Sequence, residues 1–329
     1  GYCNGGCQQG EKQSVLLTYL EDAAEAGARV LVHCRAEQVL VERGRTVGVR
    51  AIWTGPGEAR RELTIRCPRV VVAGGSIESP ALLLRSGIGG PAVGRNLKLH
   101  PAWFVGGVHD RALDAWTGQI QSVTSTDFRL LPHGGGFLPE CVILNLAFWT
   151  SSMPWLDGAA HKRDVLDLRK TSSWHAVTRD RGSGRVVIDA GGNAVVQWEL
   201  KDPRDLETAR LANVELARLH EAAGARSIFT FDPPGLRWNR DEEPLESFLD
   251  RLRQVDWAQA VAYSAHQLAS ARMGSNAQTS VADGRGQLHD VQGVWIGDAS
   301  ALPEAPGINP MIAIMALAHL TASHILEAG

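Results

Sequence analysis

Hydrophobic positions in the first third of the chain change from a helical period to a strand period. From Ser14 to Gly27 apolar residues recur three and four apart, which predicts an amphipathic helix that ends at the glycine. Residues 29–34 form a short apolar run that predicts a strand. Alternation over residues 36–53, on both sides of Arg43-Gly44, predicts an antiparallel hairpin.

The next segment combines a buried strand, a glycine turn and a helix. Residues 70–73 are apolar and precede Gly74 and Gly75, and the helix that follows is expected to be capped by Ser79 with Pro80 in its first turn. A similar pattern occurs near the C-terminus, where a strand is predicted over 293–300 and a helix over 310–326. Both segments predict an α/β fold.

The middle of the chain has a different pattern. Alternating segments at residues 118–130, 141–149 and 184–200 predict strands of a largely antiparallel sheet. Asp202 and Pro203 open a long helix that ends at Gly224, and a second helix is expected over 245–257. We therefore predict a discontinuous α/β domain formed by residues 1–101 and 261–329, with an α+β domain of residues 102–260 inserted into it.

Composition excludes several classes of protein. The 329 residues are 44% hydrophobic and 21% charged with a net charge of -3, which indicates a globular chain and gives no electrostatic reason to expect nucleic acid. The longest apolar run, MIAIMALA, is too short to span a bilayer. No signal peptide pattern follows Gly1, and we expect the chain to begin inside a longer protein, which leaves its targeting undefined.

Cysteine usage indicates reduced thiols and a cytoplasmic location. The count is odd and lacks a CxxC pair, so a disulfide framework is not expected. Cys3 and Cys7 are too few to hold a metal alone, and no metal site is predicted. The five cysteines are Cys3, Cys7, Cys34, Cys67 and Cys141.

Two helix starts are candidate binding features. The Gly74-Gly75 turn offers backbone N–H groups to a phosphate, although a tight turn packed by small residues explains it equally well. Asn309 is expected to cap the last helix, with Pro310 in its first turn. The positive end of that helix would stabilise an anion, but an ordinary core helix has the same pattern.

His266 is the histidine whose surroundings best suit chemistry. It lies among small residues in SAHQLASARMG, and it is either a general base or a buried structural group. His100, which precedes a proline in the expected crossover between domains, is less suggestive, as are His319 and His324. Hydrolase and phosphotransferase signatures are absent from the sequence, so a redox function remains.

Taken in order, these segments resemble the C-terminal two-thirds of a glucose-methanol-choline (GMC) flavoprotein oxidoreductase of the alcohol oxidase or dehydrogenase type. The similarity runs through GCQQGEKQSVLLTYLEDAAEAGARVLVHC, VVVAGGSIESPALLLRSGIGGPAVGRNLKLHP and HQLASARMG to GDASALPEAPGINPMIAIMALAH. It implies an FAD-binding α/β domain whose N-terminal glycine fingerprint lies outside this chain, and a variable substrate domain at residues 102–260.

The resemblance also implies roles for individual residues. The cofactor-binding positions would be Val39 at the adenine, Ala73, Gly74 and Gly75 at the AMP and pyrophosphate, Asp298 and Ala299 at the ribityl chain, and Asn309, Pro310 and Met311 at the isoalloxazine. His266 falls at the position of the catalytic histidine, and Asn309 falls at its partner position. The sequence ASARMG departs from the commoner Gly-Thr form after that histidine.

The implied function is oxidation of an alcohol to a carbonyl, with hydride transfer to flavin N5 and His266 as base. The cofactor would be FAD, the electron acceptor oxygen or another oxidant, and a missing N-terminal segment would bind in trans. Without that segment, Val71 and Ile296 are expected to be exposed. Two alternatives stay open: a non-catalytic fragment, pseudoenzyme or structural subunit that keeps the fold, and a nicotinamide-dependent dehydrogenase, whose glycine fingerprint is not found in the sequence.

Overall fold

The computed structural model describes residues 6–119, 121–142, 145–231 and 235–328. Two compact units form, each from segments that are distant in sequence. Unit 1 contains Gly1–Ala26, Pro101–Arg181 and Leu200–Ser264, and unit 2 contains Gly27–His100, Gly182–Glu199 and Ala265–Gly329. Relative to the predicted boundaries, residues 1–26 group with the middle segment and residues 182–199 group with the terminal ones. The division into cofactor and substrate domains stays a prediction.

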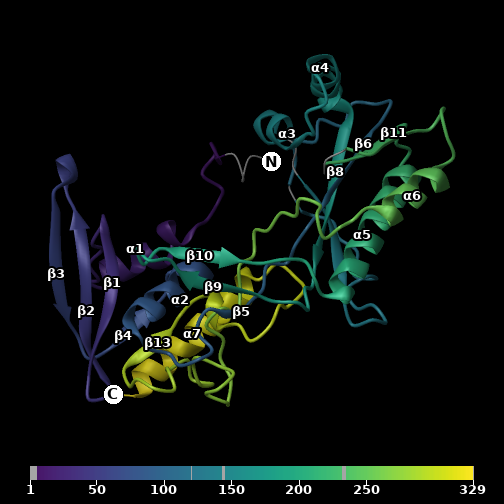
Figure 1. Ribbon diagram of the computed structural model, residues 1–329. Coiled ribbons are helices and arrows are strands. Elements are labelled where there is room, and N and C mark those ends of the chain that lie inside the picture. The colour runs from purple at the N-terminus through teal and green to yellow at the C-terminus, as the bar shows by residue number, and fades with distance from the viewer. Residues whose placement is uncertain (1–5, 120, 143–144, 232–234, 329) are drawn as a thin grey trace. The chain divides into compact units, whose positions relative to one another are not determined.

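The first sheet of unit 2 contains β1 (Cys34–Glu42), β2 (Arg45–Thr54) and β3 (Arg60–Arg66), with η2 (Pro56–Glu58) between the last two strands (Figure 1). The predicted hairpin is confirmed, and its turn residues Arg43 and Gly44 both have positive φ, as a tight two-residue turn requires. The strand predicted over residues 29–34 is wrong. Only Cys34 belongs to β1, and the apolar side chains before it are exposed because no strand covers them.

A two-stranded parallel sheet forms the centre of unit 2. It pairs β4 (Val70–Val72) with β13 (Val294–Ile296). Val72 and Ile296 are buried in the core with Leu83 and Val281. Val71, on the opposite face of its strand, is 50% exposed as expected. The expected exposure of Ile296 is wrong, because its side chain lies in this core.

Helix α2 (Gly75–Ser86) begins earlier than its sequence predicts. Gly74 is the N-cap and Pro80 lies inside the helix, so the prediction of Ser79 as cap is wrong. A proline at position 80 leaves the carbonyl of Ser76 without its helical donor. Ser270 Oγ donates to that carbonyl at 2.6 Å. A tertiary contact therefore stabilises a helix that local rules would start five residues later.

The remaining elements of unit 2 surround this centre. The segment at 184–200, predicted as a strand of the middle domain, forms β9 (Gly184–Ile188) and β10 (Ala194–Gln197) of unit 2, which pair antiparallel. Strand β9 also pairs with β5 (Arg95–Leu97). Gly94 approaches β9 so closely that a Cβ would lie 2.1 Å from the Val186 carbonyl oxygen. A short turn, η4 (Ala299–Ala301), follows β13, and α7 (Met311–Glu327) ends the chain.

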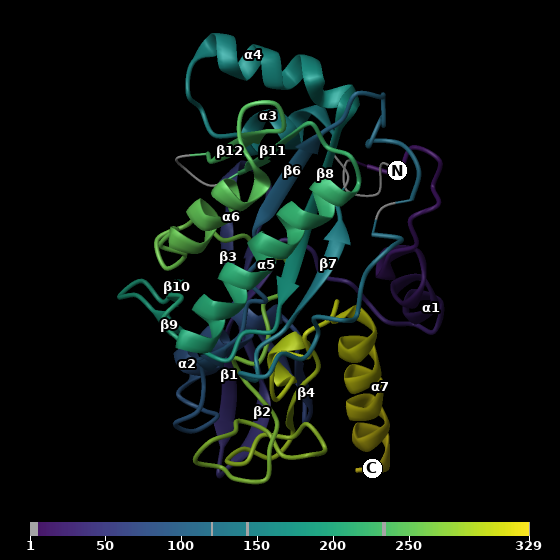
Figure 2. The same ribbon diagram turned by 90° about the vertical axis from the view of Figure 1, so that its right-hand side faces the viewer.

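Unit 1 is built on an antiparallel sheet, as predicted, but apart from Cys141 its strands lie outside the predicted segments. The strand order is β12 (Arg237–Asn239), β11 (Ser227–Thr230), β6 (Phe104–Val108), β8 (Thr171–Thr178) and β7 (Phe137–Cys141). Helix α5 (Pro203–Ala222) crosses one face of this sheet, beside α6 (Leu245–Gln254) (Figure 2). Both helices are confirmed, and Asp202 caps the first by accepting a hydrogen bond from the Arg204 N–H at 2.9 Å.

Two other strand predictions in unit 1 are wrong. Residues 118–130 contribute only an isolated bridge from Thr124 to Glu140 in their described part. After β7 the chain forms α3 (Leu146–Ser152), α4 (Gly158–Leu166) and η3 (Asp167–Lys170). The part of the 141–149 run from Leu146 onward is helical because Asn145 caps α3 and Trp149 packs on Phe229. The predicted N-terminal helix is divided into η1 (Val15–Leu17) and α1 (Tyr19–Glu25), which bury no residue.

Candidate active site

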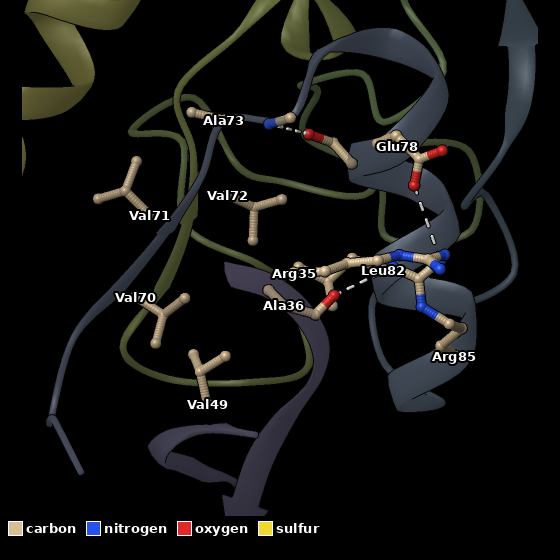
Figure 3. A pocket seen from close by; sticks show the side chains of 12 residues that line it. Arg35, Ala36, Val49, Val70, Val71, Val72, Ala73, Glu78, Leu82 and Arg85 are labelled. Carbon is tan, nitrogen blue, oxygen red and sulfur yellow. Dashed lines mark hydrogen bonds and ion pairs between the residues drawn. The ribbon is translucent and has the colours of Figure 1, made fainter. Parts of the chain in front are cut away.

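A cavity of about 460 Å³ lies in unit 2 between β4, the first turns of α2 and the β1–β2 hairpin. Ala73 and Gly74, which the family resemblance places at the AMP and pyrophosphate of a cofactor, line it (Figure 3). The walls are mostly apolar, from Val49, Val70 and Leu82, and the polar side chains come from Arg35, Glu78, Ser79 and Arg85. The cavity therefore combines an apolar slot with charged groups at its edge.

The glycine turn at the end of β4 is held by a carboxylate from the far end of the chain. Asp298 Oδ2 accepts a hydrogen bond from the Gly75 N–H at 2.8 Å and another from the Ser79 hydroxyl. Its Oδ1 accepts from the Ser300 N–H at 2.8 Å and from Ser300 Oγ. Ser79 Oγ in turn accepts from the Gly74 N–H at 2.8 Å. Asp298 thus fixes the turn through both of its oxygens.

This network changes the expected role of the two glycines. Their N–H groups, predicted to face a phosphate, are already bonded to Ser79 and Asp298. The N–H groups at Ser76 and Ile77, in the first turn of α2, have no intrahelical acceptor because of their position. An anion at this turn would therefore contact the N–H groups that begin at Ser76, one residue after the predicted Gly75.

The guanidinium of Arg85 crosses the edge of the cavity. It donates to the carbonyl oxygens of Gly192 at 3.0 Å and of Ala36 at 3.3 Å, and it lies 3.8 Å from the Glu78 carboxylate (Figure 3). Val39, predicted at an adenine, is buried in the core, and its N–H donates to Ser86 Oγ at 2.9 Å. The cavity is lined instead by Arg35 and Ala36 from the same strand region. Sequence analysis missed Arg35 and Arg85, since charged residues are common at the start of a strand and in the last turn of a helix.

The segment of residues 96–100 contacts two loops that carry predicted site residues. One loop carries His266 and the other carries Asn309. The backbone of Lys98 exchanges hydrogen bonds with that of Leu268, both at 2.9 Å, which places His266 beside this segment. The side chains of every second residue in 96–100 contact the loop that carries Asn309. Asn96 donates to the Pro303 carbonyl at 3.3 Å, Lys98 lies 3.7 Å from Glu304, and His100 accepts from the Gly307 N–H at 3.1 Å. One short segment therefore positions the loops of His266 and Asn309.

His266 contacts a histidine that the sequence did not single out. Its Nδ1 lies 3.2 Å from Nδ1 of His100, and the two rings meet edge to face with centroids 5.2 Å apart. His100 is almost fully buried, whereas His266 is half-buried. No local sequence signal marks His100, because its role depends on Gly307, which is distant in the chain.

The last helix begins one residue later than predicted. Pro310 is the N-cap of α7, so Asn309 precedes the cap, and no side-chain cap is recorded in this described segment. Asn309 is exposed and Pro310 is buried. Met311, at the first helical position, is 66% exposed. The predicted proximity of the Asn309 and His266 side chains stays a prediction.

Comparison with known proteins identifies the family. Models described as GMC oxidoreductase match residues 1–102 and residues 182–318. The chain belongs to the GMC oxidoreductase family. An uncharacterized GMC-type oxidoreductase of Mycobacterium tuberculosis is 34% identical over 331 residues, which cover 96% of this chain and 48% of the relative. A long-chain-alcohol oxidase of Arabidopsis thaliana is 31% identical, covering 99% of this chain and 46% of the relative.

Solved structures show the same fold. Pyridoxine 4-oxidase from Mesorbium loti matches with a TM-score of 0.69 at 19% identity, over 98% of this chain and 63% of that one. Formate oxidase from Aspergillus oryzae matches with a TM-score of 0.64 at 17% identity, over 90% of this chain and 60% of that one. This GMC chain spans about half the length of the first two curated relatives named above.

GMC oxidoreductases are FAD-dependent flavoproteins that act on alcohols, and the turn after β4 fits part of that cofactor. Ser76 Oγ is buried at the start of α2 and has no hydrogen-bond partner among the described residues. Gly74 is close-packed, since a Cβ there would lie 3.3 Å from Cβ of Glu78. A small turn, an unused hydroxyl and a helix N-terminus suit a phosphate. In this GMC chain, Ser76 and Ile77 would hold the phosphate, next to the cavity.

Unit 1 of this GMC chain contains a separate buried histidine cluster. Ser172 Oγ lies 3.0 Å from His109 Nε2 and 3.2 Å from His220 Nδ1, and His220 Nε2 donates to the Val105 carbonyl at 2.9 Å. Burial lowers the pKa of His220 to about 4. Burial also lowers the pKa of His109, and Arg111 adds to that effect. These histidines are neutral at physiological pH and join α5 to the sheet.

The described ranges contain neither a candidate metal cluster nor a candidate membrane span. Within them, no group of three or more His, Cys, Asp or Glu side chains could hold a metal ion. In the same part of the chain, no helix has the length and hydropathy needed to cross a bilayer. Cys7, Cys34, Cys67 and Cys141 are free thiols, and Cys3 lies outside the described residues.

Proposed function

We propose that this chain forms the catalytic part of an FAD-dependent alcohol oxidoreductase that converts an alcohol to a carbonyl. Family membership supports the reaction class. The observation that carries the assignment of the site is the anchoring of His266 and of the Asn309 loop to one segment, residues 96–100. Bound FAD supplies the hydride acceptor for the carbinol carbon.

The protein's own residues would manage the proton and the oxygen of the alcohol. We assign His266 as acceptor of the hydroxyl proton, because imidazole has a pKa close to working pH. Asn309 donates a hydrogen bond to the same oxygen through its amide. The N-terminus of α7, at Pro310 and Met311, is electropositive and would stabilise negative charge on a bound flavin. Asp298 and Ala299 border the ribityl chain, with Asp298 acting mainly through its hold on the glycine turn.

We propose a straight-chain primary alcohol as substrate. This choice follows the relatives named long-chain-alcohol oxidase, which align over 99% of this chain. The electron acceptor is oxygen or another oxidant. The reduced thiols fit a cytoplasmic protein.

We also propose that tight FAD binding requires a further protein segment, supplied in the same polypeptide or in trans. The relatives are about twice as long as the aligned chain. The exposed Val71 on β4 fits an apolar surface that such a segment covers. The glycine turn and first helix of that segment would bind the adenosine side of the cofactor.

The test is single-turnover flavin reduction without oxygen. The chain is produced with the complementary region of a family member, loaded with FAD, and mixed with primary alcohols of increasing length. Loss of the absorbance of oxidised flavin, with release of an aldehyde, is expected. Flavin that stays oxidised with every alcohol would favour a non-catalytic role. Reduction of NAD in place of flavin would favour the nicotinamide alternative.

A further inference from the structure

The hydrogen bonds of His100 determine where its proton lies. The backbone N–H of Gly307 is a donor only, so His100 Nε2, which it meets at 3.1 Å, must present a lone pair. A neutral His100 therefore carries its proton on Nδ1. That proton points to His266 Nδ1, 3.2 Å away.

The same reasoning then fixes His266. Its Nδ1 accepts the proton of His100 and must be unprotonated, so the proton of neutral His266 lies on Nε2. A cationic His266 would place two N–H groups against each other. The pair holds two protons, and the bond from Gly307 decides their positions.

The backbone around the pair is held in an unusual conformation. His100 has φ of +49° and Ala269 has φ of +66°, although neither is glycine. Non-glycine residues in this conformation are strained and persist where the surrounding structure fixes them. Here the Lys98–Leu268 bridge and the contacts of Asn96 and Lys98 with residues 303–304 provide that restraint.

We propose that His100 is a positioning residue that, together with the Gly307 N–H, holds the proton of His266 on Nε2 in the resting protein. His266 then offers a donor, not a lone pair, on the ring edge away from His100. Base action needs the opposite tautomer. In that form His266 Nδ1–H donates to His100 Nδ1, and His100 Nε2 carries a proton that faces Gly307.

The change between forms conserves two protons. His266 Nε2 releases one to water, the proton between the rings moves to His266, and His100 Nε2 takes one from water. It requires the loop of residues 303–309 to withdraw the Gly307 N–H. Release of this loop, which also carries Asn309, therefore makes His266 a base. The role of this change in catalysis rests on the proposed function. The positions of the two protons in the resting protein do not depend on it.

The experiment is two-bond ¹H–¹⁵N spectroscopy of the full chain labelled with ¹⁵N-histidine, without flavin and above the ordinary histidine pKa of about 6.5. His266→Gln and His100→Phe assign the two rings. The expected wild-type result is opposite tautomers, with the proton on Nδ1 of His100 and on Nε2 of His266. In His100→Phe, which keeps an aromatic ring, His266 loses the donor that faces its Nδ1, and its ring signals should change from those of the wild type.

Asn96→Gly is the matched control. It removes another tether of the same loop at a residue whose φ of +65° suits glycine, and it should leave both tautomers unchanged. A wild-type proton on His100 Nε2 or His266 Nδ1 overturns the proposal, as does the same spectral change in Asn96→Gly. If His100→Phe does not fold, the wild-type spectrum still decides. Correct tautomers in a loaded enzyme that oxidises no alcohol would refute only the proposed function.

Discussion

The carboxylate of Asp298 and the backbone N–H of Gly75 are joined by a 2.8 Å hydrogen bond across 223 residues of sequence. This contact ties the end of β13 to the start of α2. It makes one side chain responsible for the shape of the candidate phosphate turn. Its energetic importance can be measured directly.

Asp298→Asn should lower the free energy of unfolding by about 2–3 kcal/mol, because the new amide turns its N–H groups toward donors that the carboxylate accepted. Asp290→Asn is the control. Among the described residues, Asp290 accepts one hydrogen bond, at Oδ2 from the Gly89 N–H, and the oxygen of asparagine can replace it. Urea unfolding of both variants tests the difference. Equal losses would show that the two oxygens of Asp298 are not both required.

His266→Ala should reduce turnover of the complete, flavin-loaded enzyme by about 10²- to 10⁴-fold while flavin content stays near normal. The reason is loss of the group that accepts the hydroxyl proton. Flavin absorbance per protein and steady-state aldehyde formation are the measurements. His33→Asn, at an exposed residue with φ of +54°, is the control and should not change turnover. Full turnover in His266→Ala would remove the histidine from the reaction.

Stability of the chain should fall as the pH drops from neutrality toward 4. The pKa of His220 is about 4 in the fold and about 6.5 when unfolded, so the unfolded state binds more protons in this window. The contribution of His220 is present above pH 6.5, and about 3 kcal/mol of it is lost by pH 4. Urea midpoints measured across this range should show the decline.

His220→Gln should make the decline with pH smaller. Glutamine donates to the Val105 carbonyl as His220 Nε2 does, but it takes up no proton. The same urea series measures the variant. An unchanged pH dependence would mean that His220 is not the group responsible.

Gly107→Ala should destabilise unit 1 by about 3 kcal/mol or more through overpacking, since a Cβ there would lie 2.4 Å from His220 Nδ1 and 3.2 Å from Cβ of Ala225. Gly158→Ala is the control, because nothing lies within 4 Å of its added methyl group. That substitution, at the start of α4, should be neutral or stabilising by about 0.5–1 kcal/mol. Thermal unfolding of the pair distinguishes overpacking from a general effect of adding a methyl group.

The isolated 329-residue chain should bind FAD more weakly than the chain produced together with the N-terminal region of a GMC relative. The cavity beside α2 is lined by β1, β2, β4 and α2 with the turn before it, and we expect these elements to supply one wall of such a site. Flavin fluorescence after gel filtration measures retention, and the co-produced complex should be yellow. A monomeric isolated chain with one bound flavin that oxidises alcohols would contradict this prediction.

The sequence by itself determined the elements whose signals are local. The turn at Arg43-Gly44 predicts the β1–β2 hairpin, and Asp202-Pro203 predicts the start of α5, because turn and cap preferences act within a few residues. The order of short motifs also indicated the family, which the comparisons confirm. Pattern alone failed over most of 118–130 and 141–149, because in the described parts of these runs only Thr124 and Cys141 pair with another strand.

Only the tertiary structure decided the features that depend on distant partners. Pro80 fits inside α2 because the Ser270 hydroxyl takes the place of the missing donor to Ser76. His100 matters because the backbone of Gly307, far along the chain, fixes its proton and through it that of His266. A single ring can adopt either tautomer, and the sequence around it does not contain the donor that selects one. Such proton positions follow from contacts between segments that the fold alone brings together.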